Sequence, residues 1–271
     1  MAHTYLEYWG FRKSPFENVP DGSIFFHSIQ HKEALSRLLF AVEQRKGAAM
    51  LTGEVGSGKT TVGKALESRL PGEKFNVQSI INPALEPIDF IRAILLAIDE
   101  SANTDSKVLL LNRLQNRLVQ NAAQGLNNVL IIDEAHLIKN EAGFEELRML
   151  LNMQSDNHFL ITLIILGQPK LHEYIERLKP LKERISVKYH VTPLNLRDTV
   201  RYILYRLKSA GAERGIFTKE SIFPIYEYAR GLPLRINNLC DRCLLVGFMN
   251  RTRVVNAKTV DEAIADLEQT Q

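Results

Sequence analysis

The hydrophobic positions of the chain form two alternating patterns up to residue 192. Short apolar runs rich in β-branched residues alternate with stretches in which apolar residues recur every three or four positions. The first pattern is typical of buried strands and the second of amphipathic helices, so their alternation predicts a parallel α/β sheet. Strands are expected at 48–51, 75–80, 129–132, 159–166 and 185–191, and helices at 61–70, 87–98, 106–123 and 141–153.

Two of these strands have a predicted place in the sheet. The run 159–166 is apolar and β-branched along most of its length, which predicts a central strand. In 185–191, apolar and polar residues alternate strictly, and this period of two predicts a half-exposed edge strand.

After Thr192-Pro193 only helical patterns follow. Asn195 suits a helix N-cap with Asp198 three residues later, and Gly211 suits the end of that helix. Further helices are expected at 219–229, 234–249 and 259–267. We therefore predict two domains, an α/β domain over 1–192 and a small helical domain over 193–271.

A phosphate-binding motif lies between the first predicted strand and the helix that follows it. Residues 53–60 fit G-x-x-x-x-G-K-[ST] at every fixed position, and the glycines let backbone N–H groups converge on a phosphate at a helix N-terminus. Lys59 is expected to reach the β- and γ-phosphates and Thr60 to ligate Mg²⁺. The expected nucleotide contacts are Gly53, Glu54, Val55, Gly56, Ser57, Gly58, Lys59, Thr60 and Thr61.

A second motif ends the apolar run 129–132 in two carboxylates, Asp133 and Glu134. Carboxylates directly after a buried parallel strand lie at the ligand-bearing edge of a sheet. We expect Asp133 to serve as a Mg²⁺ ligand through water and Glu134 as the general base for an attacking water. A solvated surface position is the alternative for Glu134. Together the two motifs predict nucleotide binding and ATP hydrolysis.

Composition adds little to this interpretation. The chain has 271 residues, of which 45% are hydrophobic, enough for one large or two modest cores. Its formal net charge of +3 neither requires nor excludes nucleic acid, because a local basic face matters more than the total. Basic residues after position 170 are scattered among acidic ones, which is typical of a solvated surface.

Cys240 and Cys243 are the only cysteines in the sequence. A zinc site would need two further ligands nearby and a redox motif a βα context, and the sequence has neither. Two buried thiols on a leucine-rich helix are therefore predicted, in a reducing compartment. The N-terminus lacks a secretion signal, and no apolar run approaches the ~20 residues that span a bilayer. The prediction is a cytoplasmic chain without a transmembrane segment.

Several short segments beyond the two motifs resemble the AAA+ ATPases, and among them the ExeA-like (general secretion pathway protein A) family. The likeness covers essentially the whole chain, and its most specific parts are the opening and the Gly167-Gln168-Pro169 corner. It implies a P-loop NTPase (AAA+) parallel sheet sandwiched by helices, a small all-helical lid domain, and ATP with Mg²⁺ as ligands. The segments are 5–11, 14–16, 26–28, 31–35, 166–169, 183–185 and 236–241.

The resemblance implies roles for three further residues. Gln168 matches sensor 1, which feels the γ-phosphate or holds the lytic water; the alternative is a turn residue beside Pro169. Arg184 matches the arginine finger inserted into a neighbouring subunit's site, whereas its local sequence alone suggests a surface residue. Arg235 is the candidate for sensor 2, but it stands one position, or ~100° of helix, past the usual place after Pro233.

The same resemblance implies that 15–31 packs on the adenine and that the active form is a ring or filament of identical subunits. It favours an ATPase that drives conformational work on a protein assembly in secretion or pilus biogenesis, in the cytoplasm or at the inner face of the cytoplasmic membrane. A DNA-dependent ATPase of transposition or helicase loading is one alternative. An ATP-binding scaffold subunit with little turnover is the other.

Overall fold

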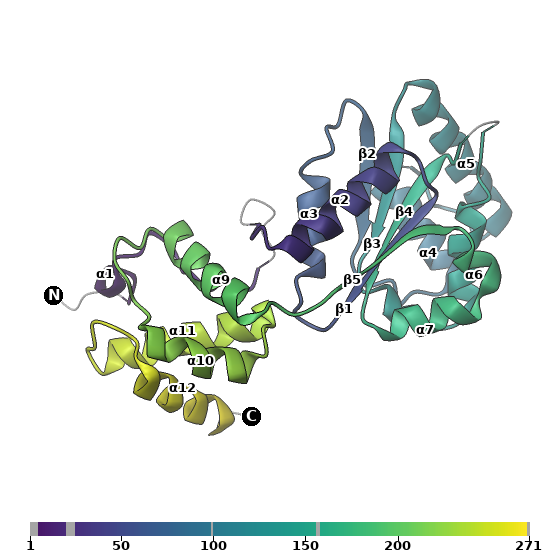
Figure 1. Cartoon of the computed structure of the whole chain (residues 1–271). Coiled ribbons are helices and arrows are strands. Elements are labelled where there is room, and N and C mark those ends of the chain that lie inside the picture. Colours follow the sequence, from purple (N-terminus) through teal and green to yellow (C-terminus); the bar gives the residue numbers. More distant parts are fainter. Residues whose placement is uncertain (1–4, 20–24, 99, 156–157, 270–271) are drawn as a thin grey trace. The chain divides into compact units, whose positions relative to one another are not determined.

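The computed structural model describes residues 5–19, 25–98, 100–155 and 158–269. Its contacts divide the chain into two compact units (Figure 1). Unit 1 comprises Met1–Ser28, Glu54–Gly58 and Thr192–Gln271, and unit 2 comprises Ile29–Gly53 and Lys59–Val191. The C-terminal helices thus separate from the sheet at Thr192. The described residues before Ile29 group with those helices, whereas the sequence had suggested that they belong with the sheet.

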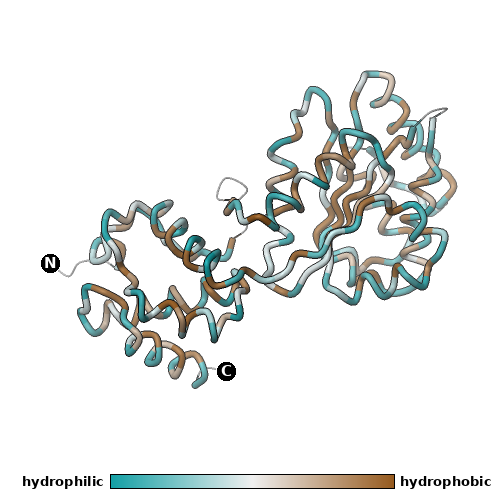
Figure 2. The backbone as a smooth tube through the Cα atoms, viewed as in Figure 1, coloured by the Kyte–Doolittle hydropathy of each residue, from teal (hydrophilic) through white to brown (hydrophobic). Residues whose placement is uncertain are grey.

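Unit 2 is built on a five-stranded sheet in the order β2-β3-β4-β1-β5, in which every pairing is parallel. Each predicted strand is present, β4 lies inside the sheet and β5 at an edge, as expected. Figure 2 shows the hydrophobic residues concentrated along the strands in the middle of this unit. The strands are β1 (Ala48–Gly53), β2 (Phe75–Ile80), β3 (Asn127–Ile132), β4 (Ile161–Gly167) and β5 (Ile185–Val191).

Helices cover both faces of the sheet, because successive strand residues point to opposite faces and both sets are apolar. Helix α2 (Ile29–Glu43) and helix α3 (Lys59–Glu67) pack on one face, against β1, β4 and β5. The opposite face carries Met50, Leu130 and Leu163 into a core with the remaining long helices. Those helices are α4 (Pro87–Ala97), α5 (Lys107–Ala123) and α6 (Glu141–Leu150).

Short helical segments complete unit 2. The 3₁₀ turn η1 (Ala135–Leu137) follows β3, and α7 (Lys170–Arg177) and α8 (Lys179–Lys182) connect β4 to β5. Side chains cap the first turns of α5 and α6. Ser106 accepts a hydrogen bond from the Leu109 N–H, and Asn140 accepts one from the Gly143 N–H.

Unit 1 has its own hydrophobic core, formed by the C-terminal helices and the short N-terminal helix α1 (Tyr5–Trp9). Trp9 is 2% exposed, and its indole N–H donates to the Leu244 carbonyl over 3.1 Å. Asn195 caps α9 as expected, by accepting from the Asp198 N–H. The helices are α9 (Leu196–Ser209), α10 (Lys219–Ala229), α11 (Pro233–Met249) and α12 (Ala257–Gln269).

Candidate nucleotide-binding and hydrolysis site

The glycine-rich loop joins β1 to α3 and has the backbone that phosphate binding requires. Gly56 and Gly58 have φ values of +77° and +95°, in the left-handed region that favours glycine. Lys59 begins α3 with its side chain buried, and its Nζ donates to the Gly53 carbonyl over 2.9 Å. The ammonium group is therefore already folded over the loop. Thr61 follows in the first turn of α3.

Thr60 and Asp133 meet at the carboxyl edge of the sheet. The Thr60 hydroxyl donates to Asp133 Oδ2 over 2.6 Å, and Asp133 is 5% exposed at the end of β3. The other carboxylate oxygen, Oδ1, accepts the Glu134 backbone N–H over 2.8 Å. Hydroxyl and carboxylate oxygens held side by side are the donor set that Mg²⁺ prefers, so these residues fit the predicted ion.

Glu134 has a left-handed backbone, with φ +53° and ψ +35°, which is costly for a residue with a side chain. Its carboxylate Oε2 lies 3.1 Å from Nδ1 of His136, a buried residue of η1 that the sequence interpretation did not select. The Gln168 backbone N–H donates to the same Nδ1 over 3.4 Å. A signal for His136 was present, because it lies two residues after Glu134 at the same sheet edge.

Gln168 directly follows β4, so its position at the end of a central strand is as expected. Glu134, His136 and Gln168 are thereby gathered at the carboxyl ends of β3 and β4, next to the end of β1. The side-chain roles of these residues in hydrolysis remain predictions.

Arg184 lies at the amino ends of the strands, opposite to the carboxyl ends that carry the glycine-rich loop. It immediately precedes β5, whose first residue Ile185 pairs with Ala48, whereas Gly53 at the start of the loop pairs with Val191. At roughly 3.3 Å per residue, the seven residues of β5 separate the amino and carboxyl ends of this strand by about 20 Å. Arg184 Nη1 is buried and has no hydrogen-bond partner among the described residues.

In unit 1, Leu234 contacts Gly56 of the glycine-rich loop. Its backbone N–H donates to the Gly56 carbonyl over 3.2 Å, and a Cβ added to Gly56 would lie 2.4 Å from the Leu234 Cβ. Arg235, one position later on α11, is exposed. A role for Arg235 as sensor 2 remains a prediction.

The stretch 15–31, expected to pack on adenine, is described except for residues 20–24. Its first part is held by unit 1: Arg206 donates to the Pro15 and Glu17 carbonyls, each over 2.6 Å. The Asn18 side chain exchanges hydrogen bonds with Asn237 and Asn238 on α11. Packing against adenine stays a prediction.

Cys240 and Cys243 are free thiols buried on α11, as predicted. Burial raises the pKa of both thiols, which keeps them in the unreactive protonated form. Within the described ranges, no group of three or more His, Cys, Asp or Glu side chains is arranged to hold a metal ion. Nor does any helix in those ranges have the length and apolarity needed to cross a bilayer.

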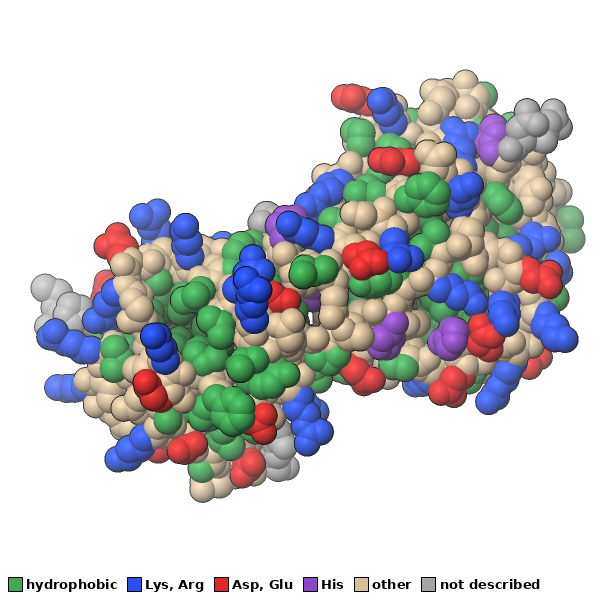
Figure 3. Space-filling view, viewed as in Figure 1, with side chains coloured by type: hydrophobic (Ala, Val, Ile, Leu, Met, Phe, Trp, Pro, Cys, Tyr) green, Lys and Arg blue, Asp and Glu red, His purple; other side chains and the backbone are tan. Residues whose placement is uncertain are grey.

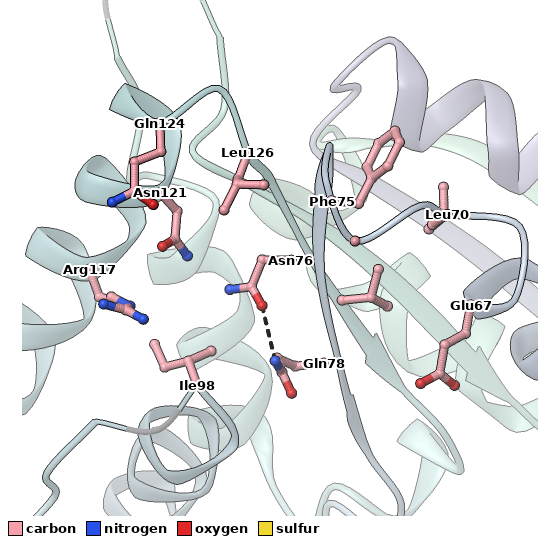
Figure 4. Close-up of a pocket in the computed structure, with 12 residues that line it drawn as sticks. Glu67, Leu70, Phe75, Asn76, Gln78, Ile98, Arg117, Asn121, Gln124 and Leu126 are labelled. Atoms are coloured by element: carbon pink, nitrogen blue, oxygen red, sulfur yellow. Dashed lines mark hydrogen bonds between the residues drawn. The ribbon is translucent and has the colours of Figure 1, made fainter.

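A hollow of about 440 Å³ follows the unpaired edge of β2 (Figure 4). Its polar lining consists mainly of amides, and Asn76 accepts a hydrogen bond from Gln78 within it. Arg117 and Asn121 of α5 face this edge. The residues of the glycine-rich loop are not part of its lining, so it is distinct from the nucleotide site.

The face drawn in Figure 3 bears charges of both signs. Lys and Arg side chains lie among Asp and Glu side chains over both units. On this face there is accordingly no continuous basic surface of the kind that tracks a nucleic-acid backbone.

Comparisons with known proteins agree with this geometry. Residues 42–175 match the model of an AAA domain family. The chain is 34% identical over 248 residues to general secretion pathway protein A of Aeromonas hydrophila, a match that covers 90% of this chain and 45% of that protein. The chain therefore spans somewhat less than half the length of this relative.

Solved structures show the same fold at low sequence identity. The Aeropyrum pernix ORC1 protein in complex with DNA aligns with a TM-score of 0.72 at 22% identity, over 95% of this chain and 70% of that one. The Aeropyrum pernix ORC2 protein in its ADP form aligns with a TM-score of 0.72 at 15% identity, over 94% and 73%. These alignments establish a shared architecture of an α/β domain followed by helices.

Proposed function

Because the chain belongs to the AAA+ ATPases of the ExeA-like family, we propose that it binds and hydrolyses ATP to drive conformational work on a protein assembly of a secretion or pilus machine. The observation that carries the proposal is the pairing of Thr60 with Asp133, 2.6 Å apart, immediately beside Glu134. Two motifs far apart in the sequence thus supply adjacent oxygens at one sheet edge.

In this proposal the glycine-rich loop and Lys59 bind the phosphates of ATP. Lys59 exchanges its present hydrogen bond to the Gly53 carbonyl for phosphate oxygens, which costs little because the side chain is already ordered and partly desolvated. Thr60 and Asp133 would hold Mg²⁺. When bound, the ion neutralises phosphate charge that develops during hydrolysis.

Glu134 acts as the general base, accepting a proton from the water that attacks the γ-phosphate. The hydrogen bond from its N–H to Asp133 fixes its αL backbone. Gln168, at the end of the next strand, orients the water or senses the γ-phosphate. Both assignments rest on the adjacency of the β3 and β4 ends.

Arg184 serves a neighbouring subunit's site. Because about 20 Å of strand separates the amino ends of the strands from their carboxyl ends, Arg184 and the glycine-rich loop of one chain belong to different surfaces. A head-to-tail contact between copies brings such surfaces together, and repeated contacts of this kind form a ring or a filament.

We place the protein in the cytoplasm, at the inner face of the cytoplasmic membrane, where a secretion machine is reached. The rival is a DNA-dependent ATPase, since one structure of the same fold is a complex with DNA. On the face drawn in Figure 3, charges of both signs are interspersed, so this face has no continuous basic surface for DNA.

Measuring phosphate release from ATP distinguishes the secretion ATPase from a DNA-dependent ATPase and from a scaffold subunit. We expect Mg²⁺-dependent release whose rate per subunit rises with protein concentration and does not respond to long double-stranded DNA. Stimulation by DNA that falls steeply with salt would establish the rival. Tight nucleotide binding without release at any concentration would identify a scaffold subunit.

A further inference from the structure

His136 lies between two elements of the proposed hydrolytic site, Glu134 and the end of β4. Its side chain is 2% exposed on η1, the turn that follows the two carboxylates of β3. One atom, Nδ1, lies 3.1 Å from Glu134 Oε2 and also receives the Gln168 backbone N–H over 3.4 Å. The proposed base and the end of β4 therefore share a single ring nitrogen.

The two partners need opposite protonation of that nitrogen. A carboxylate needs a proton on Nδ1, whereas a backbone N–H needs a lone pair there. Burial lowers the pKa of His136, which favours the neutral ring, and a neutral ring has one proton for its two nitrogens. Nδ1 can thus satisfy either Glu134 or Gln168, but not both at once.

The surroundings make this choice matter for Glu134. The Glu134 backbone is fixed by Asp133, so its carboxylate is positioned through side-chain torsions and neighbours. Oε2 is buried and makes no hydrogen bond within the described ranges, although Nδ1 lies at ion-pair distance. The end of β4 is packed closely on η1: a Cβ added to Gly167 would lie 3.4 Å from the His136 backbone nitrogen.

We propose that His136 is a positioning residue that fixes the Glu134 carboxylate relative to the end of β4, through a hydrogen-bonding atom at its Nδ1 position. This inference rests on the proposed ATPase function and on Glu134 as the base. If the Gln168 N–H moves away from Nδ1, that nitrogen can donate a hydrogen bond to the Glu134 carboxylate. The ends of β3 and β4 are therefore coupled through one atom. The hydrolytic step depends on this atom, whereas nucleotide binding does not.

Three substitutions test the atom rather than the ring. Asn places a polar atom near the Nδ1 position, Gln places one near Nε2, and Ala places none. We expect His136→Ala to lower kcat by about 10- to 100-fold, as for a slightly misplaced catalytic group, with nucleotide Kd changed by less than about twofold. His136→Asn should recover most of the rate and His136→Gln should not. His172→Ala, at a 52% exposed histidine of α7, is the matched control and should behave as wild type.

A double variant shows whether His136 acts through the base. If it does, Glu134→Gln combined with His136→Ala is no slower in single turnover than Glu134→Gln alone. Further loss in the double variant, equal rates for the Asn and Gln variants, or a wild-type kcat in His136→Ala would each overturn the inference. Circular dichroism checks folding, and if the Ala variant is unfolded, the comparison of Asn with Gln decides.

The proposed function fails in a different way. Absence of hydrolysis in the wild type, or wild-type hydrolysis in Glu134→Gln, would remove the ATPase or the base itself. Normal wild-type turnover that Glu134→Gln abolishes and His136→Ala leaves intact would remove only the role of His136.

Discussion

The hydroxyl of Thr60 donates to Oδ2 of Asp133 over 2.6 Å across 73 residues of sequence. The contact joins the first turn of α3 to the end of β3, and β4 lies between β1 and β3 in the sheet. It shows that the two motifs form one polar site. The hydrogen bond also holds in place the pair of oxygens that we assign to Mg²⁺.

Asp133→Asn should weaken the use of Mg²⁺. The amide removes the negative charge that attracts the ion and one of its acceptor positions, so we expect a 10-fold or greater rise in the Mg²⁺ concentration needed for half-maximal hydrolysis. A Mg²⁺ titration at saturating ATP measures this. Asp105→Asn, at a fully exposed carboxylate, is the control and should leave the titration unchanged. An unchanged midpoint in Asp133→Asn would remove the ligand assignment.

Arg184→Ala should be inactive alone but complementable. The Arg184→Ala protein has an intact glycine-rich loop, and the Lys59→Ala protein has an intact Arg184. In a mixed oligomer, Arg184 of one variant can therefore reach the intact loop of the other. We expect activity to return on mixing. If light scattering shows mixed oligomers but no activity returns, Arg184 does not act in trans.

Trp9→Ala should destabilise unit 1 by about 3–5 kcal/mol, the usual cost of removing a fully buried aromatic side chain. Trp9 is the chain's single tryptophan, so its fluorescence in the wild type reports unfolding of this unit directly. Urea unfolding followed by circular dichroism compares the two proteins. A loss below about 1 kcal/mol would contradict the view that the N-terminal segment is part of the helical core.

Acid should weaken the connection between α7 and β5. Hydrogen bonds from Lys182 and Lys188 lower the pKa of Glu176 to about 2. A lowered folded-state pKa gives stability that is present above the ordinary value of 4.5 and is lost as the pH falls toward 2. Glu176→Gln lacks this contribution at every pH, so its unfolding midpoint should change less than that of the wild type between pH 4.5 and 2. If the unfolding midpoints of the wild type and Glu176→Gln change equally over this pH range, protonation of Glu176 does not control this loss of stability.

Much of the fold was predictable because local pattern and burial agree. The strands 75–80 and 185–191 begin and end where the sequence predicts, since turn residues or a change of period mark their limits. Helix α2 was not predicted, although Ala34, Leu35 and Leu38 form an apolar stripe at helical spacing. Helix α6 ends at Leu150, three residues early, because Gln154 pairs with Phe159 in an isolated antiparallel bridge that precedes β4.

The candidate site was predictable as far as its motifs reach. Lys59, Thr60 and Asp133 follow from fixed spacings, because phosphate and metal binding demand particular atoms at particular strand ends. The spacing places His136 two residues after Glu134 but gives it no role, since its importance lies in the distances from one ring nitrogen to Glu134 and to the Gln168 backbone. The contact of Leu234 with Gly56 likewise depends on tertiary packing.

The central claim is that one site binds ATP through the glycine-rich loop and hydrolyses it through Glu134. Lys59→Ala removes a phosphate contact, whereas Glu134→Gln keeps the shape of the site and removes the base. Fluorescent nucleotide binding and phosphate release, measured on both variants and the wild type, separate these effects. We expect Lys59→Ala to bind weakly, and Glu134→Gln to bind as the wild type does while turnover falls about 100-fold or more. Wild-type turnover in Glu134→Gln would contradict the account.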